Sequence, residues 1–252
     1  QDRFAINPDG AVDVIIPVVN TNPLFRANLL SAYRAIPVRR LLIGDGGSTD
    51  GSVAIAQAFP RVTVCDQRDF RSLGYCLRDL IARVESEWFV YLHSDVYLPG
   101  DWFDKMRAHQ GAFDWFECDR RKTVLLDYDD AAQNQAARPY SGSQMGRRAA
   151  FSPFLEQIDD DYLYRNEDLI LQELIERHGG RYGRVHDTFH HHQLMNKPGE
   201  TEPDFAEARF LRRENPAWVR RTFDMQVRGL VKYTDPVKDY NVDQVYASIK
   251  EL

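Results

Sequence analysis

The chain has little cysteine and no long apolar run, and each shortage excludes a class of protein. Its 252 residues contain three cysteines, an odd number with no CxxC pair, so neither a disulfide framework nor a cysteine-built zinc site is indicated. The apolar runs, such as 14–19 and 88–92, are short and interrupted. They fall well below the roughly 18 residues of a membrane-spanning helix. This composition predicts a reducing, cytoplasmic location.

An excess of positive charge is also missing. The chain has 32 lysine and arginine residues against 38 aspartate and glutamate residues, a net charge of −6. A chain of that balance is not predicted to bind nucleic acid. Six arginines nevertheless cluster after position 208: Arg209, Arg212, Arg213, Arg220, Arg221 and Arg228. They predict either an acceptor-side element or peripheral contact with the inner face of a membrane, with a solvated helical face as the alternative.

The glycine-rich phosphate loops of two common nucleotide-binding folds are absent too. Residues 44–52 read GDGGSTDGS, which is neither GxGxxG nor a P-loop, so a dinucleotide-binding site and a Walker-type NTPase are not indicated. Residues 17–23 contain no glycine and no lysine. What remains is an ordinary globular composition, in a chain long enough for one large domain, alone or with a small appendage.

The first hundred residues alternate between strand-like and helix-like patterns. Four short apolar runs predict strands, at 12–18, 40–44, 62–65 and 88–92. Pro17 lies inside the first run, and we expect that strand to end there because proline donates no ladder hydrogen bond. Helical spacing of apolar residues fills the intervals after 22–23, at 53–59 and at 73–84. This order predicts an α/β fold with a mostly parallel sheet. Ligands bind such sheets at the carboxyl ends of the strands.

Two polar clusters follow predicted strand ends. Asp45 can accept the imino N–H of a nucleobase, although a tight turn with Ser48 or Asp50 capping the next helix is an equal alternative. In the His-Ser-Asp triplet of 93–95, Asp95 can ligate a divalent cation that also grips phosphates. A plain turn at the strand end is the alternative there.

A third acidic pair, Glu167 and Asp168, opens a predicted helix. Acidic residues in a first turn complement the helix dipole, and Asn166 is a plausible N-cap. The alternative is a carboxylate that takes a proton from an attacking hydroxyl.

Four of the seven histidines lie within residues 186–192. If 188–192 is extended, His190 and His192 point to one face and His191 to the other. A pair on one face can offer an imidazole to a metal. Structural or merely exposed histidines are the alternative.

Together and in this order, these features resemble the family-2 type of glycosyltransferase with the GT-A fold. The matching segments are the opening strand and proline at 12–17, the near Asp-Asp-Gly-Ser-Thr-Asp-Gly motif at 45–51, the glycine-to-arginine helix up to Arg78, the DxD position within 91–99, the acceptor-side segment at 143–148 and the ED motif at 166–169. The match covers roughly residues 12–193.

The resemblance implies a Rossmann-like, mostly parallel central sheet flanked by helices. It places the GT-A domain at 1–195, with a nucleotide-binding half at 1–100 and an acceptor-binding half at 101–195, and leaves a helical extension at 196–252. The activity implied is the metal-dependent, inverting transfer of a sugar from a UDP- or GDP-sugar. The implied cofactor is Mn²⁺ or Mg²⁺, and the acceptor is a hydroxyl on a glycan, a lipid-linked group or a small molecule.

The resemblance also assigns roles to individual residues. On the nucleotide side, Asp45 would contact the base, Pro17 and Val19 would lie along the nucleoside, and Ser94 and Arg78 would lie near the nucleotide. Asp95 would bind the metal, with His190 or His192 completing its shell. Asp168 and Glu167 would form the catalytic pair, in which Asp168 is the base. For Arg78, a solvated helix charge is the alternative.

Two positions depart from the family pattern. Gly46 replaces a second aspartate, and His93 replaces the first aspartate of DxD. The His-Ser-Asp form occurs in a subset of this superfamily, so we interpret it as a variant of a working site. Two other classes stay open: a sugar nucleotidyltransferase, which usually has the glycine-rich loop that 17–23 lacks, and a non-catalytic nucleotide- or carbohydrate-binding protein, which the loss of the DxD aspartate favours.

Overall fold

The computed structural model describes residues 4, 6, 9–21, 25–70, 73–122, 142–157 and 167–192. The strands are β1 (Val12–Val18), β2 (Val38–Asp45), β3 (Val62–Asp66), β4 (Trp88–Leu92), β5 (Val96–Tyr97), β6 (Trp115–Lys122), β7 (Ser143–Arg147) and β8 (Tyr182–His192). The helices are α1 (Phe25–Ala35), α2 (Ser52–Gln57), α3 (Leu73–Ala82), α4 (Trp102–Arg107), α6 (Arg148–Phe151) and α7 (Glu167–Arg177), with a 3-10 turn η1 (Leu155–Gln157). None of these helices is long and apolar enough to cross a membrane.

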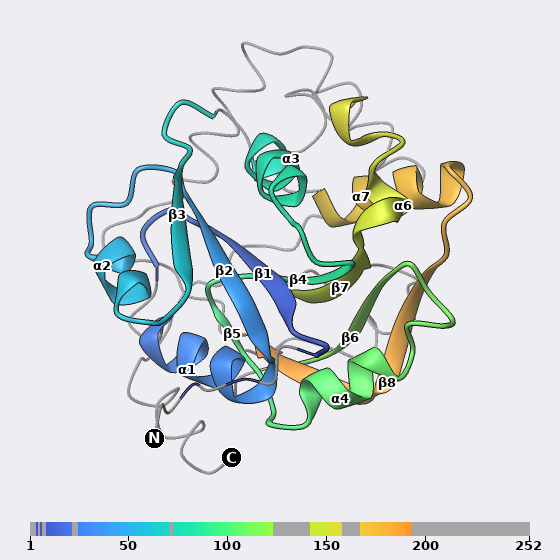
Figure 1. Ribbon diagram of the computed structural model, residues 1–252, viewed down its shortest axis with the longest axis horizontal. Helices are drawn as coiled ribbons and strands as arrows, with labels where there is room; N and C mark the ends of the chain where they lie inside the picture. The colour runs from blue at the N-terminus through green and yellow to red at the C-terminus, as the bar shows by residue number, and fades with distance from the viewer. Residues whose placement is uncertain are drawn as a thin grey trace.

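These strands form one mixed sheet in the order β3-β2-β1-β4-β7-β6-β8-β5 (Figure 1). The set β3-β2-β1-β4 is parallel, and α1, α2 and α3 connect its strands. Beyond β4, β7 runs antiparallel to both β4 and β6, while β8 runs parallel to β6. The predicted α/β class with a Rossmann-like sheet is confirmed. The predicted helical extension at 196–252 lies outside the described residues.

Helices cover both faces of the sheet. On one face, α1 and α4 pack on alternate side chains of β1 and β6, with Phe25 and Trp102 fully buried. On the other face, α3, α6 and α7 pack against β4 and the start of β6. α3 does so because Leu77, Leu80 and Ile81 recur at helical spacing and form one apolar stripe. Two covered faces explain why the central strands are nearly continuous apolar runs.

β1 continues one residue past Pro17, which corrects the expected strand end. Pro17 pairs in register with Gly44 of β2, and the Val18 carbonyl accepts a hydrogen bond of 2.9 Å from the Gly46 N–H. Successive residues of a strand direct their backbone groups to opposite sides, so Pro17 faces the β4 side. Pairing with β4 has already ended at Ile15 there, and the missing proline N–H therefore costs no ladder bond.

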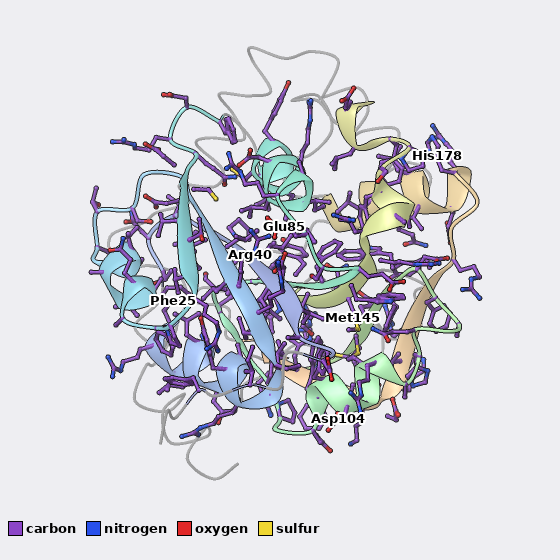
Figure 2. The ribbon with its side chains drawn as sticks, viewed as in Figure 1. Phe25, Arg40, Glu85, Asp104, Met145 and His178 are labelled. Carbon is purple, nitrogen blue, oxygen red and sulfur yellow. The ribbon has the colours of Figure 1, made fainter. Side chains whose placement is uncertain are left out.

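A charged cluster lies at the amino end of β1, opposite the carboxyl ends of the parallel strands. Asp13 is fully buried and pairs with Arg39 at 3.0 Å and Arg40 at 2.7 Å. Its carboxylate also accepts the backbone N–H of Glu85 at 2.7 Å. Figure 2 shows Arg40 and Glu85 side by side, and a hydrogen bond of 2.9 Å joins them. Burial alone would raise the pKa of Asp13, but the hydrogen bonds from Arg40, Glu85 and Arg39 lower it below its ordinary value.

We expect Asp13→Asn to lower the free energy of unfolding by about 3 kcal/mol, because it leaves a buried, formerly paired site half satisfied. Since the folded pKa is lowered, the carboxylate's contribution is present at neutral pH and is lost as the pH falls below about 4. Urea unfolding at pH 7 and at pH 3 measures both effects. Asp101→Asn, which removes an exposed pair with Lys105, is the matched control and should change nothing measurable.

Candidate active site

The turn at 93–95 lies where several strand ends meet. It follows β4 and leads into β5, which pairs antiparallel with the end of β8 through Val96↔His192 and Tyr97↔His191. The N–H of His93 donates a hydrogen bond of 2.9 Å to the carbonyl of Gly142, just before β7. β8, the last of these strands in the chain, thus lies beside the segment that follows β4. Residues 93 and 192 become neighbours although about a hundred positions separate them.

Three side chains converge at this turn. His93, Asp95 and His192 each offer one ligand atom, and these atoms lie within 4.8 Å of one another. Nε2 of His192 is 3.3 Å from Oδ1 of Asp95, and the rings of His93 and His192 stand perpendicular with centroids 5.5 Å apart. His192 is 5% exposed, whereas the Asp95 side chain keeps 24% of its surface open. A carboxylate and two imidazoles are a donor set that suits a divalent cation.

The electrostatics of the cluster favour the metal-binding forms of its ligands. Burial alone would raise the pKa of Asp95, but His192 and His93 outweigh it and hold the pKa of this carboxyl below its usual value. Burial lowers the pKa of His192 despite the neighbouring Asp95. An ionised carboxylate beside a neutral imidazole is the state that accepts a metal without first losing protons.

α1 holds the turn in place. The Asn28 side-chain amide donates 2.9 Å to the carbonyl of Ser94, and the hydroxyl of Ser31 accepts the N–H of Leu98 at 3.0 Å. Both α1 side chains are buried. Because polar groups of a packed helix fix the backbone on each side of Asp95, its carboxylate is positioned before any ligand arrives.

The histidine segment is extended and forms the end of β8, which is the condition under which His190 and His192 were expected to share a face. His190 and His192 share one face, with ring centroids 5.5 Å apart, and His191 packs near Tyr97 at 6.3 Å. His190 bonds through Nδ1 to the hydroxyl of Ser143 at 2.8 Å, and burial lowers its pKa well below the ordinary value. The three-residue cluster contains His93, which the comparison with the family motif treated only as a lost aspartate. His190, a candidate ligand from the sequence, is not one of its three members, and its ring centroid lies 5.5 Å from that of His192.

Asp45 ends β2 at the same edge of the sheet. Its carboxylate accepts the N–H of Ser48 at 2.8 Å, so part of the expected turn chemistry is present. α2 begins after Gly51 without a side-chain cap bond, and Asp50 instead accepts the N–H of Ser52 at 3.0 Å. The two loops at the ends of β1 and β2 are tied together, since the N–H of Asn20 donates 3.0 Å to the Ser48 hydroxyl.

Gly46, which replaces the family's second aspartate, lies against the side chain of Val19. A Cβ on Gly46 would lie 2.4 Å from a methyl carbon of Val19, closer than any real contact. Val19 is nevertheless 56% exposed. An exposed apolar side chain two residues beyond Pro17 and beside the Asp45 turn is a surface on which a planar base or ribose can lie.

The remaining predicted site residues lie on α3 and α7. The Arg78 guanidinium of α3 lies 5.7 Å from the ring centroid of Tyr75, and its role toward a nucleotide stays a prediction. Glu167 and Asp168 are the first two residues of α7, and their side chains lie outside the described part of the structure. α7 connects directly to the start of β8 and packs on it.

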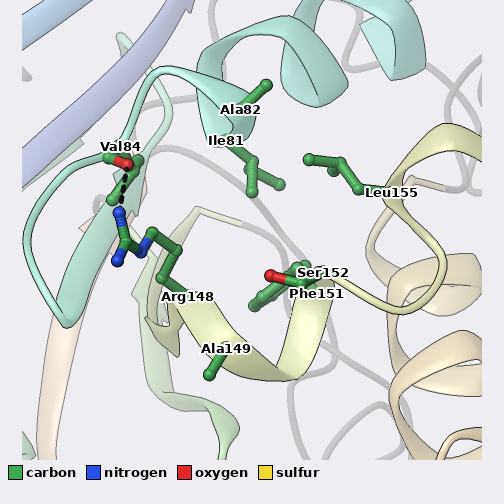
Figure 3. A pocket seen from close by; sticks show the side chains of 8 residues that line it. All are labelled: Ile81, Ala82, Val84, Arg148, Ala149, Phe151, Ser152 and Leu155. Carbon is green, nitrogen blue, oxygen red and sulfur yellow. Dashed lines mark hydrogen bonds between the residues drawn. The ribbon is translucent and has the colours of Figure 1, made fainter.

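A cavity of about 310 Å³ lies elsewhere, between the end of α3 and α6 (Figure 3). Arg148 lines it and donates 3.3 Å to the carbonyl of Val84. The N–H of Arg148 also bonds to Glu87, just before β4. This cavity therefore sits at the amino end of β4, away from the turn at 93–95.

The mixed sheet and the helices that cover it form an α/β protein with the GT-A fold. Residues 13–122 match the family model described as glycosyl transferase family 2, a range that runs from the second residue of β1 to the end of β6. The resemblance to family-2 type glycosyltransferases is thus confirmed. No curated protein sequence matches the chain significantly.

Solved structures with the same fold are diverse in sequence. TarS 1–349 from S. aureus matches with a TM-score of 0.58 and 14% identity, over 72% of this chain and 60% of that one. Glucosyl-3-phosphoglycerate synthase from Mycobacterium tuberculosis, with Mn²⁺, UDP and phosphoglyceric acid, gives 0.54 and 19%, over 75% and 72%. The mannosyltransferase PcManGT from Pyrobaculum calidifontis, with GDP-Man and Mn²⁺, gives 0.58 and 16%, over 77% and 61%. At these identities the likeness concerns the fold, and the chain spans about 60% of the TarS and PcManGT structures.

Proposed function

We propose that this chain is a metal-dependent, inverting glycosyltransferase that moves a sugar from a UDP- or GDP-sugar to a hydroxyl acceptor. The observation that carries the proposal is the convergence of His93, Asp95 and His192 at the carboxyl end of β4, on the edge where Asp45 ends β2. The family match over 13–122 supports the activity class. Two structures of the same fold contain Mn²⁺ with UDP or GDP-Man, which supports the donor and the metal.

The residues present fit a divalent cation. His192 is buried and faces the ionised Asp95, and His93 completes a set of one oxygen and two nitrogen donors. Mg²⁺ is held through oxygen ligands, so two imidazoles favour Mn²⁺ of the two proposed ions. When bound, the cation would supply Lewis-acid stabilisation of the charge that develops on the departing diphosphate.

The chain's own residues would divide the remaining work. Asp45 accepts a base N–H, and Val19 with Pro17 provides the apolar surface under the nucleoside. Asp168 takes the proton of the acceptor hydroxyl while that oxygen attacks the far face of the sugar, which inverts the anomeric carbon. The position of Asp168 in the first turn of α7, a helix that packs on β8, supports this assignment.

We expect UDP or GDP to raise the melting temperature only when Mn²⁺ or Mg²⁺ is present. At a hundredfold excess over Kd, binding stabilises a protein by about 2.7 kcal/mol, which corresponds to a rise of about 5–10 °C for a chain of this size. Thermal unfolding with nucleotide plus EDTA and with metal alone provides the controls. No shift with any nucleotide and metal would contradict the proposal. Release of pyrophosphate from a nucleoside triphosphate and a sugar phosphate would indicate a nucleotidyltransferase instead.

A further inference from the structure

Two buried imidazole nitrogens face one small space beside Gly142. Nε2 of His190 and Nδ1 of His192 have no hydrogen-bond partner among the described residues, although the two side chains are only 0% and 5% exposed. A Cβ built on Gly142 would lie 2.7 Å from the first nitrogen and 3.0 Å from the second. The two nitrogens are therefore close enough for one water molecule to bridge them.

The other nitrogen of each ring is already engaged. Nδ1 of His190 bonds to the hydroxyl of Ser143 at 2.8 Å, and Nε2 of His192 lies 3.3 Å from the carboxylate of Asp95. Ser143, His190, His192 and Asp95 thus form a row in which each ring has one engaged nitrogen and one that faces the shared space. Because a neutral imidazole has one donor and one acceptor nitrogen, the tautomer of either ring sets the tautomer that suits the other.

We propose that His190 is a positioning residue for the metal site. Its Nε2 accepts a hydrogen bond from the Nδ1–H of His192, directly or through one water. This inference rests on the metal site proposed above. Nε2 of His192 would hold the cation together with Asp95 and His93, and the His192 ring would then carry its proton on Nδ1. His190 then accepts at Nε2 and donates from Nδ1 to the hydroxyl oxygen of Ser143. Neither ring gains or loses a proton overall, and only the tautomers reverse.

The surroundings of His190 are built to keep its ring in this orientation. The thiol of Cys118 lies 3.3 Å from the Ser143 hydroxyl and 3.6 Å from Nδ1 of His190, and the Trp102 indole N–H donates to the same thiol at 3.2 Å. Gly142 has a φ of +146° and has no room for a Cβ. A second imidazole that orients a metal-binding imidazole is a device of the outer shell of metal sites.

Mn²⁺ affinity, measured by the electron paramagnetic resonance of free Mn²⁺ without nucleotide, tests the proposal. His190→Leu should weaken binding about 10–100-fold, the effect typical of an outer-shell partner. His190→Gln, whose side-chain carbonyl can accept at the position of Nε2, should restore most of it. His186→Leu, on the exposed part of β8 where His186 pairs with Asp119 at 2.9 Å, is the matched control and should bind like the wild type.

The tautomer itself gives a second readout. In ¹⁵N-histidine spectra of the wild-type protein, His192 should carry its proton on Nε2 without metal and on Nδ1 with Zn²⁺, a diamagnetic ion that binds imidazole. An unchanged tautomer, or wild-type Mn²⁺ affinity in His190→Leu, overturns the role of His190 and leaves the proposed function standing. Absence of Mn²⁺ binding by the wild type would overturn the metal site itself. If His190→Leu does not fold, the wild-type spectra decide.

Discussion

Asp168→Asn is expected to lower turnover about 10²–10⁴-fold while nucleotide binding stays at the wild-type level. Asparagine keeps the size of the side chain but cannot take the proton of the attacking hydroxyl, and general-base help is typically worth this range. Release of nucleoside diphosphate from the sugar donor measures turnover, with water as the acceptor until an acceptor hydroxyl is found. Melting temperature with nucleotide and Mn²⁺ measures binding in the same samples.

Two further variants on α7 make the result specific. Glu167→Gln tests the neighbouring carboxylate of the proposed catalytic pair, and a larger loss there than at Asp168 would exchange their roles. Glu176→Gln, on the exposed last turn of the same helix, changes the helix charge equally and should leave turnover unchanged. Wild-type turnover in Asp168→Asn would remove this residue as the base.

Asp95→Asn is expected to weaken Mn²⁺ binding by more than about 100-fold, beyond the range of outer-shell changes. It removes the one carboxylate of the three-residue cluster and with it the negative charge that faces His192 at 3.3 Å. The nucleotide-dependent rise in melting temperature with Mn²⁺ should disappear together with metal binding. Titration calorimetry with Mn²⁺ and thermal unfolding with UDP or GDP give the two measurements.

The control for this variant is another acid on the same strand as a cluster member. Asp187 lies on β8, with an exposed side chain 3.4 Å from the ring of His109. Asp187→Asn should bind Mn²⁺ like the wild type. If Asp95→Asn did so as well, while circular dichroism showed both variants folded, the metal would have to lie outside the cluster.

Most of the parallel half of the sheet was predictable from the order of apolar runs. The strand at 88–92 was predicted with its observed bounds, and the others differ by a few residues at their ends. β1 differs because the cost of Pro17 depends on which neighbour its nitrogen faces, and a single strand does not contain that information. The antiparallel insertion of β7 beside β4 was likewise not visible, because pairing partners that far apart leave no local pattern.

The types of residue in the proposed site were also predictable from the sequence. Which of the histidines lie together with Asp95 was not. Asp95 and the alternation of His190 and His192 followed from the turn after a strand and from the period of two. His93 was interpreted as a missing aspartate, although a histidine beside Asp95 already offered a second ligand. That signal could have been used, since imidazole and carboxylate are both common metal ligands.

By itself, the sequence determined the α/β class, the edge of the sheet where the proposed site lies, and the residue types gathered there. These properties follow from periodicity and from strand ends, which are local. The tertiary structure alone decided that His93 and His192 meet at Asp95, because β5 pairs with β8 and closes the curl of the sheet. It also decided that His190 faces Gly142 and Ser143, since contacts between residues tens of positions apart depend on how the strands pair and not on any short stretch of chain.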